Sequence, residues 1–189
     1  MAVLNKSSFH ICEMCGYAVR AGFTRLHKEE HLTSGGRKCP STFLKKYSLG
    51  YRFETDVFLL VFPDEMDYLQ QNTAWSVLYA ILRGVTDTLD LEESDIARCL
   101  QHIRKDGYGT TCFILYDTTP GGAGHVRRLL DANLLQRSIQ RALELVRACT
   151  CGGPEGHASC YACLRSYRNQ KIHDILDRSL AIQFLSKLY

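Results

Sequence analysis

Residues 110–128, TTCFILYDTTPGGAGHVRR, place an apolar run directly before a glycine-rich turn and a helical pattern. The run at 110–116 is rich in β-branched and aromatic residues, which predicts a strand. Apolar residues then recur at helical spacing over 125–148, which predicts a long helix. Such turns often bind phosphate, but a P-loop also needs the lysine of GxxxxGK[ST], and no such motif occurs in this chain. We therefore expect Gly121 and Gly122 to make a sharp turn that brings the helix back across the sheet.

Further elements flank this strand, turn and helix. An Asp-Gly pair between residues 95–103 and 110–116 predicts a β-hairpin. Residues 53–62, FETDVFLLVF, predict a strand that is buried on both faces later in its course. Apolar residues at helical spacing predict amphipathic helices at 72–90 and 172–188. The expected fold class is α/β, with α+β as the alternative: a small mixed sheet with packed helices.

The composition is typical of a soluble globular protein, with 46% hydrophobic and 23% charged residues. No stretch approaches about 18 uncharged apolar residues, and the N-terminus lacks a signal-peptide core, so we expect a cytoplasmic protein without membrane contact. The charge is uneven: residues 1–49 carry a net +5, residues 50–120 a net −7 and residues 121–189 a net +5. The basic ends favour contact with nucleic acid or an acidic partner, and ordinary solvated side chains are the alternative.

Nine cysteines are many for a cytosolic chain, and seven of them gather near its two ends. The C-terminal cluster reads Cys149-x-Cys151-x8-Cys160-x2-Cys163. Four thiolates suit a tetrahedral zinc ion and leave no position open for water, so the ion would be structural. His157 is an alternative fourth ligand if Cys149 only ends the preceding helix.

The N-terminal cluster reads Cys12-x2-Cys15, followed by His27, His31 and Cys39. His27 and His31 are four residues apart, as are the two histidines that end a two-Cys two-His zinc finger. The number of residues after Cys15 and the positions of the apolar residues do not match that motif. We expect Cys12, Cys15, His31 and Cys39 to bind a second ion, and His27 stays open as the alternative to His31.

The first cysteine cluster also predicts how the chain divides into domains. We expect an N-terminal zinc knuckle at residues 1–48 and an α/β domain at residues 49–189 that carries the four-cysteine site. Both ligand sets are closed, so the expected cofactors are two structural zinc ions.

Two stretches carry a family resemblance: YDTTPGGAGH, and SCYACLRSYRNQ within the C-terminal cluster. They resemble the MrfA-type zinc-binding domain, which is the C-terminal domain of a family of superfamily-2 DNA helicases implicated in repair of mitomycin damage. Related domains occur in phage-defence systems. The resemblance covers the chain from about residue 9 to its end. It implies that the four C-terminal cysteines hold structural zinc, and that the partner is a helicase or translocase subunit, or helicase lobes upstream. The motor does not carry over, because the chain lacks a P-loop and has no room for two helicase lobes.

The segment CLRSYRNQK favours a binding function. Arg165, Arg168 and Lys171 are interleaved with tyrosines, a pattern that holds phosphates and stacks on unpaired bases. Tyrosines that pack the knuckle, with arginines facing water, are the alternative. We therefore expect a helicase-associated module without a motor, acting in DNA repair or phage defence, that contacts DNA, preferably single-stranded, or the motor.

Two other function classes remain open. Asp117, at the end of a strand, and His125, after the glycines, would form the centre of a metal-dependent nuclease or other phosphoesterase. The structural alternative is that Asp117 caps the turn and His125 caps or packs. Within the turn itself, we expect Gly124 to permit close packing. A protein-interaction subunit without nucleic-acid contact is the third class. The sequence leaves intrinsic catalysis uncertain and favours none.

Overall fold

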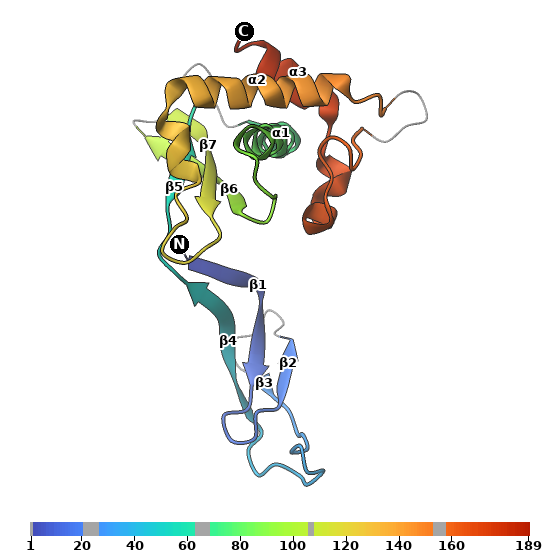
Figure 1. Cartoon of the computed structure of the whole chain (residues 1–189). Helices are drawn as coiled ribbons and strands as arrows, with labels where there is room; N and C mark the ends of the chain where they lie inside the picture. The colour runs from blue at the N-terminus through green and yellow to red at the C-terminus, as the bar shows by residue number, and fades with distance from the viewer. Residues whose placement is uncertain (1, 21–26, 63–68, 106–107, 153–157) are drawn as a thin grey trace. The chain divides into compact units, whose positions relative to one another are not determined.

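The structure is a computed structural model, and it describes residues 2–20, 27–62, 69–105, 108–152 and 158–189. The chain forms two compact units, Met1–Phe53 and Glu54–Tyr189, which are described in turn (Figure 1). The expected boundary between residues 48 and 49 falls within a strand of the first unit, and the division into those two domains stays a prediction. Among the described helices, none combines the length and apolar character that a membrane span requires.

The first unit is a four-stranded antiparallel sheet in the order β2-β1-β4-β3. Its strands are β1 (Ala2–Ile11), β2 (Ala18–Arg20), β3 (His27–Lys28) and β4 (Phe43–Arg52). Side chains alternate between the two faces of such a sheet. On β4, Leu44 is buried whereas its neighbour Phe43 is 56% exposed, so one face is covered and the other is open. The covered face packs with the cysteine-containing turns.

The second unit contains a three-stranded antiparallel sheet in the order β5-β7-β6. Its strands are β5 (Val57–Leu60), β6 (Ile96–Lys105) and β7 (Tyr108–Asp117), and β6 pairs with β7 along its whole length as the expected hairpin. The expected strand at 53–62 is shorter than predicted. The expectation that it is buried on both faces is wrong, because β5 is an edge strand that exposes Val57 and Leu59. The expected Asp-Gly turn lies outside the described residues.

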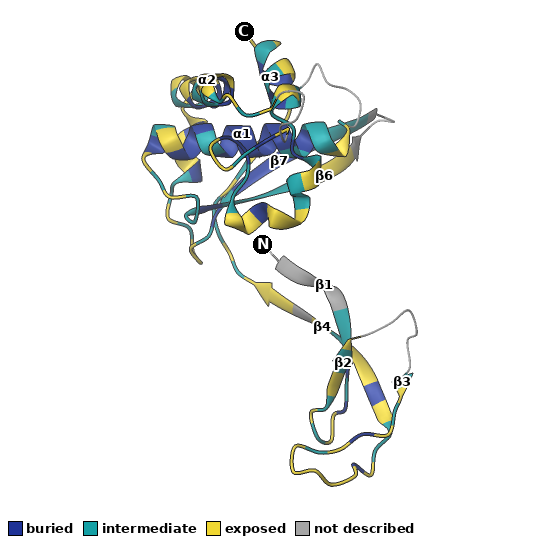
Figure 2. Ribbon diagram, turned by 90° about the vertical axis from the view of Figure 1, so that its right-hand side faces the viewer, coloured by how far each residue is buried: buried dark blue, intermediate teal, exposed yellow. Residues whose placement is uncertain are grey.

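The helices cover this sheet. They are α1 (Gln71–Leu89), η1 (Val126–Leu130), α2 (Ala132–Ala148), η2 (Tyr167–Ile175) and α3 (Arg178–Ser186), of which η1 and η2 are 3₁₀ segments. Helix α1 is buried along most of its length, since it packs against the sheet on one side and against α2 and α3 on the other (Figure 2). A Cβ atom on Gly84 would lie 2.2 Å from the carbonyl oxygen of Ser138, so α1 and α2 cross with their backbones close together.

Two of the expected helices are interrupted. The pattern at 125–148 divides into η1 and α2, because the Asp131 carboxylate accepts the amide hydrogens of Asn133 and Leu134 and caps a new helix. The pattern at 172–188 divides into η2 and α3 in the same way, with the Asp177 carboxylate accepting from Ser179. The mixed helix-and-sheet class is confirmed, and since all described strand pairs are antiparallel, the fold is α+β.

Candidate metal centres

The C-terminal cysteines converge from two segments. Cys149 caps the end of α2, Cys151 follows it, and Cys160 and Cys163 lie on one tight turn. Their sulfur atoms all lie within 4.8 Å of one another. The Sγ–Sγ distances are 3.5 Å from Cys149 to Cys160, 3.5 Å from Cys151 to Cys163 and 3.9 Å from Cys160 to Cys163. Disulfide sulfurs lie about 2.05 Å apart, whereas four sulfurs at ~2.3 Å from a tetrahedral zinc lie ~3.8 Å apart. The spacing therefore fits a metal.

Backbone contacts hold this turn in place. The Cys160 amide donates to the Cys163 sulfur over 3.1 Å, and the Cys160 carbonyl accepts amide hydrogens from the turn that follows it. The guanidinium of Arg178, at the start of α3, donates to the carbonyls of Val146, over 3.1 Å, and Cys151, over 2.8 Å. One side chain thus ties α2, the first cysteine pair and α3 together. No pattern of residues predicts this role of Arg178, because its partners are backbone carbonyls distant in the chain.

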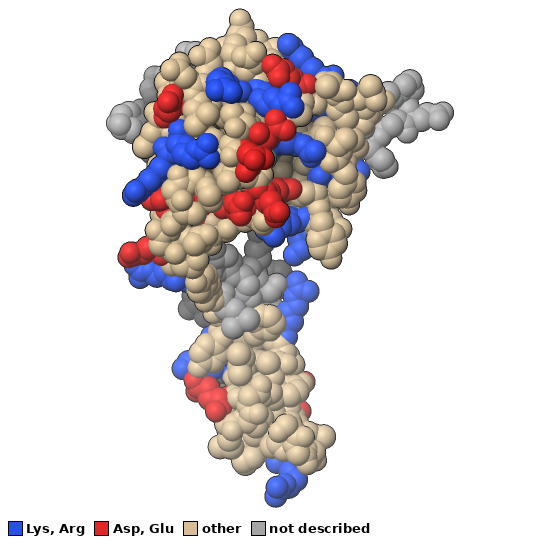
Figure 3. Space-filling view, in the orientation of Figure 1, with Lys and Arg blue, Asp and Glu red and all other residues tan. Residues whose placement is uncertain are grey.

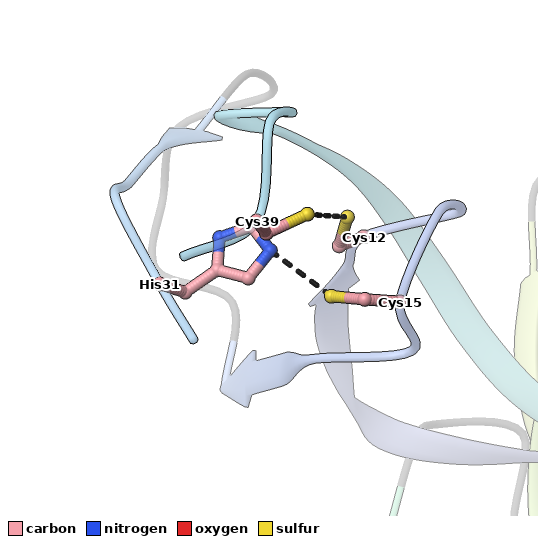
Figure 4. A group of neighbouring side chains, drawn as sticks. All are labelled: Cys12, Cys15, His31 and Cys39. Carbon is pink, nitrogen blue, oxygen red and sulfur yellow. Dashed lines mark hydrogen bonds between the residues drawn. The ribbon is translucent and has the colours of Figure 1, made fainter. Parts of the chain in front are cut away.

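The N-terminal cluster is built in the same manner (Figure 4). Cys12 and Cys15 lie on the turn after β1, while His31 and Cys39 come from the loop between β3 and β4. The sulfurs of Cys12 and Cys39 are 3.8 Å apart, and His31 Nε2 lies 3.2 Å from the Cys15 sulfur. Gly16 has φ 78°, a left-handed conformation that glycine adopts without strain, which lets the turn close under the sulfurs.

The ring of His31 is oriented for coordination. Its Nδ1 bonds to the Glu29 carbonyl over 2.9 Å, which leaves Nε2 facing the sulfurs, and Tyr17 stacks on the ring with centroids 4.5 Å apart. A backbone carbonyl on the second ring nitrogen is the usual support of a zinc-bound histidine. His27 is not part of the group: its Nε2 bonds to the Glu29 carboxylate over 2.8 Å, and its ring stacks on the buried His10. His157 lies outside the described residues.

The charges in both clusters suit a divalent cation. Burial raises the pKa of Cys160, but contacts with Cys149 and the Ala162 amide outweigh it and bring the pKa to about 7. In the N-terminal cluster, burial likewise opposes ionisation of Cys12, but the backbone amides of Cys15 and Met14 bring its pKa to about 6. Each site therefore forms one thiolate readily. The backbone hydrogen bond to Glu29 raises the pKa of His31 to about 9, so a metal ion must displace a proton from His31 as well as from the other thiols.

Each cluster offers four donors, Cys₄ at one end of the chain and Cys₃His at the other, in geometries compatible with two structural zinc ions. The expected cofactors are thus confirmed as a pair of ions. Which side chains ligate them stays a prediction, although the structure brings together the expected sets. A closed four-donor set does not supply the open position that catalytic zinc needs for water or substrate. The arrangement can cross-link chain segments, and it does not activate a nucleophile.

The glycine-rich turn is organised by Asp117. Its carboxylate is fully buried and accepts three amide hydrogens, from Ala123 at 2.8 Å and from His125 and Val126 at 3.1 Å each. Both carboxylate oxygens are therefore used by the turn itself, as in the capping alternative. Asp117 and His125 belong to neither group of potential metal donors found among the described residues. The geometry thus supports a scaffold role for Asp117 and does not support a phosphoesterase centre.

The glycines of the turn have different roles. Gly121, Gly122 and Gly124 all have φ between 79° and 89°, which an L side chain rarely adopts. A Cβ on Gly122 would also lie 2.5 Å from the carboxylate of Asp56, so only glycine fits there. A Cβ on Gly124 would meet nothing within 4 Å. The expectation that Gly124 permits close packing is therefore wrong, and its conformation is the reason for glycine.

The three expected nucleic-acid contacts differ in their surroundings. The Arg165 guanidinium donates to Ser159 Oγ over 3.0 Å and to the His173 carbonyl over 3.5 Å, so it is occupied within the knuckle. Arg168 and Lys171 are exposed on η2, and among the described residues neither forms an ion pair. Arg168 and Lys171 are therefore the more exposed of the three residues, and a nucleic-acid role for any of them stays a prediction.

The comparisons with known proteins agree with this geometry. Residues 77–164 match the family model of the MrfA Zn-binding domain. The matched residues include Cys149, Cys151, Cys160 and Cys163. Among solved structures, the chain is similar to the crystal structure of the DUF1998 helicase MrfA bound to DNA, with 18% identity and a TM-score of 0.51. The match covers 85% of this chain and 20% of that helicase, so the chain spans a small part of its length. At this identity the likeness shows the fold. The curated proteins yielded no match.

Proposed function

Because residues 77–164 match the family model of the MrfA Zn-binding domain, we propose that the chain is a zinc-stabilised module of an ATP-dependent DNA helicase or translocase. In this proposal it has no motor of its own and works with helicase lobes that are either a separate subunit or part of the same polypeptide. It contacts the motor and DNA, and the preferred DNA is single-stranded. Its biological setting is DNA repair or phage defence.

The observation that carries this proposal is the pair of closed four-donor clusters, one in each compact unit. Closed zinc sites fix loops that a small core cannot hold by itself, which creates a rigid surface for binding. The polar group that is most suggestive of catalysis, Asp117, is committed to three backbone amides. The chemistry of the described residues therefore favours a binding module over an enzyme.

The exposed cations of η2 offer one contact for DNA. Arg168 and Lys171 lie beside Tyr167, which is 82% exposed, on the segment that follows the C-terminal cysteines. Cations neutralise phosphates, and an exposed aromatic ring stacks on an unpaired base. This short segment is held by the buried Asn169, whose side chain bonds to the Ser166 amide and the Leu164 carbonyl over 2.8 Å each.

Binding of a fluorescent oligothymidylate, followed by anisotropy between 50 and 200 mM salt, tests the DNA contact. Each phosphate contact adds about 0.7 to the slope of log affinity against log salt for a single strand. The double variant Arg168→Ala, Lys171→Ala should bind more weakly and lower that slope by roughly 1.4. The control is Arg137→Ala on the exposed side of α2, which should bind as the unaltered protein does. If the unaltered chain binds no DNA at low salt, the protein-interaction class is the better account.

Association with the motor needs its own test. The helicase lobes encoded in the same or the adjoining gene are co-expressed with this chain, and co-purification is measured with and without a zinc chelator. We expect a complex that is lost when the metal is removed. Deletion strains then separate the two settings, because a repair role predicts sensitivity to mitomycin and a defence role predicts increased plating of phage.

A further inference from the structure

We propose that the open face of the N-terminal sheet is a stacking surface for single-stranded DNA. This inference rests on the proposed DNA contact and assigns it a place in the first unit. The open face is defined by residues whose side chains share one side of the sheet, as the strand register requires: Phe9, Ile11, Ala18, Arg20, Lys28, Phe43, Lys45 and Tyr47.

The register separates this face from the zinc knuckle. Tyr47 pairs with Phe9 and Lys45 pairs with Ile11, so these four side chains project from the same side of the sheet. Leu44, one residue before Lys45, projects from the other side and is buried in the core that contains Cys12 and Cys39. Metal binding and packing thus occupy one face and leave the aromatic and basic side chains of the other face outside the core.

Aromatic rings and cations alternate on the open face. Lys28 lies directly opposite Phe43 in the register, and its ammonium is 4.7 Å from the centre of that ring. The Lys45 ammonium is 5.5 Å from the centre of the Tyr47 ring. Phe43 is 56% exposed although it is a large apolar side chain. Both ammonium groups lie over a ring face, so a base can stack there once the lysine moves from the ring to a phosphate. Aromatic rings beside cations on a sheet suit a single strand, because the bases stack on the rings and the phosphates meet the ammonium groups.

The charge of the first unit is complementary to a nucleic acid. Residues 1–53 contain nine Lys and Arg against three Asp and Glu, a net charge of +6. Residues 54–189 contain fourteen against seventeen, a net charge of −3. On the face of that larger unit in Figure 3, acidic and basic side chains are interspersed. The concentration of positive charge in the smaller unit favours that unit as the site that meets phosphates.

One acidic side chain, Glu13, contacts the open face. The Glu13 carboxylate accepts from the Lys45 ammonium at 3.0 Å and from the Tyr47 hydroxyl. Glu13 and Met14 also line a hollow of about 700 Å³ at the end of β4, together with Ser41, Phe43, Leu44, Lys45 and Lys46. A phosphate would compete with Glu13 for Lys45, so removal of the Glu13 charge should strengthen binding.

The rings explain why the ligand is a single strand. Bases in a duplex already stack on one another, whereas an unpaired strand presents both faces of each base to an aromatic side chain. Substitution of one stacking ring by alanine lowers affinity by roughly 5-fold or more, which corresponds to about 1 kcal/mol at the least. The basic side chains by themselves would bind a duplex equally well.

The test uses the full chain, loaded with zinc, and anisotropy of labelled oligothymidylate at low salt. Phe43→Ala and Tyr47→Ala should each weaken binding roughly 5-fold or more, while Phe43→Trp retains it. Lys28→Ala should weaken binding, and Lys38→Ala is the matched control, because Lys38 is an exposed lysine outside the four strands that pairs with Glu30. Glu13→Gln should bind more tightly than the unaltered chain. Zinc content and circular dichroism confirm that each variant is folded, and Phe43, being exposed, can be replaced without loss of packing.

The outcomes separate this inference from the proposed function. If the unaltered chain binds the oligonucleotide and the ring variants bind equally well, the open face is not the site, and the DNA contact on η2 stands. If a blunt duplex competes as well as the single strand, the stacking role is refuted. If the unaltered chain binds no DNA, the DNA contact of the proposed function fails together with this inference.

Discussion

Asp117→Asn separates a scaffold role from a catalytic role at the glycine-rich turn. The substitution keeps the shape of the side chain but replaces one acceptor oxygen by an NH₂ group. Asp117 accepts three amide hydrogens, two at one oxygen and one at the other. In the variant at least one of these amides faces a donor. A hydrogen bond to a charged group contributes about 1.5–3 kcal/mol, and an unsatisfied buried amide costs about 1–3 kcal/mol. We expect the free energy of unfolding of this unit to fall by about 2–4 kcal/mol.

Urea unfolding followed by tryptophan fluorescence measures this loss. Trp75, the single tryptophan of the chain, lies on α1 and reports on the unit that contains Asp117. With a slope of about 2 kcal/mol per molar urea, a 3 kcal/mol loss moves the midpoint by about 1.5 M. Asp87→Asn is the matched control, because the Asp87 carboxylate pairs at 2.6 Å with Arg141, both side chains are more than 40% exposed, and such pairs contribute about 1 kcal/mol or less.

Two results would refute the reasoning about Asp117. Equal midpoints for the two variants would show that the three amide contacts do not stabilise the turn. A phosphodiesterase activity in the unaltered protein that Asp117→Asn abolishes, with the urea midpoint unchanged, would establish the catalytic class instead.

Three further perturbations probe the packing and the metal centres. Gly84→Ala should lower the free energy of unfolding by about 2 kcal/mol. Overpacking costs up to ~3 kcal/mol, and the higher helix propensity of alanine offsets ~1 kcal/mol of that cost. An unchanged urea midpoint would contradict the close crossing of α1 and α2. Arg178→Ala removes the donor from two backbone carbonyls and should lower the free energy of unfolding by about 1–3 kcal/mol. It should also speed the release of zinc to a chromogenic chelator. An unchanged release rate would show that Arg178 does not stabilise the cysteine loop. Removal of zinc with phenanthroline should unfold both units by circular dichroism, and a chelated protein that keeps its spectrum would speak against structural metal.

Much of the fold was predictable because its signals are local. The hairpin of β6 and β7 follows from two β-rich runs on either side of an Asp-Gly pair, and α1 follows from apolar spacing. Two cysteines with two residues between them place both sulfurs on one turn, so the spacing alone indicated where metal would bind. The expectation of two zinc ions needed nothing beyond these patterns.

Other features depend on contacts that spacing does not encode. Asp131 and Asp177 end the continuous helical patterns by capping, although apolar periodicity continues across both positions. The role of Asp117 depends on where the turn places three amides, and the need for glycine at position 84 depends on the approach of α2. The open face of the first sheet required the strand register, since Phe43 and Leu44 are adjacent in sequence and lie on opposite sides.

Two closed structural zinc centres stabilise this chain. The direct measurement is the metal content of the purified chain by elemental analysis together with native mass spectrometry. We expect two zinc ions per molecule in the unaltered protein, and only one in whatever folded fraction remains of Cys12→Ser or Cys160→Ser. A stable unaltered chain that carries no zinc, or both variants retaining two ions, would contradict it.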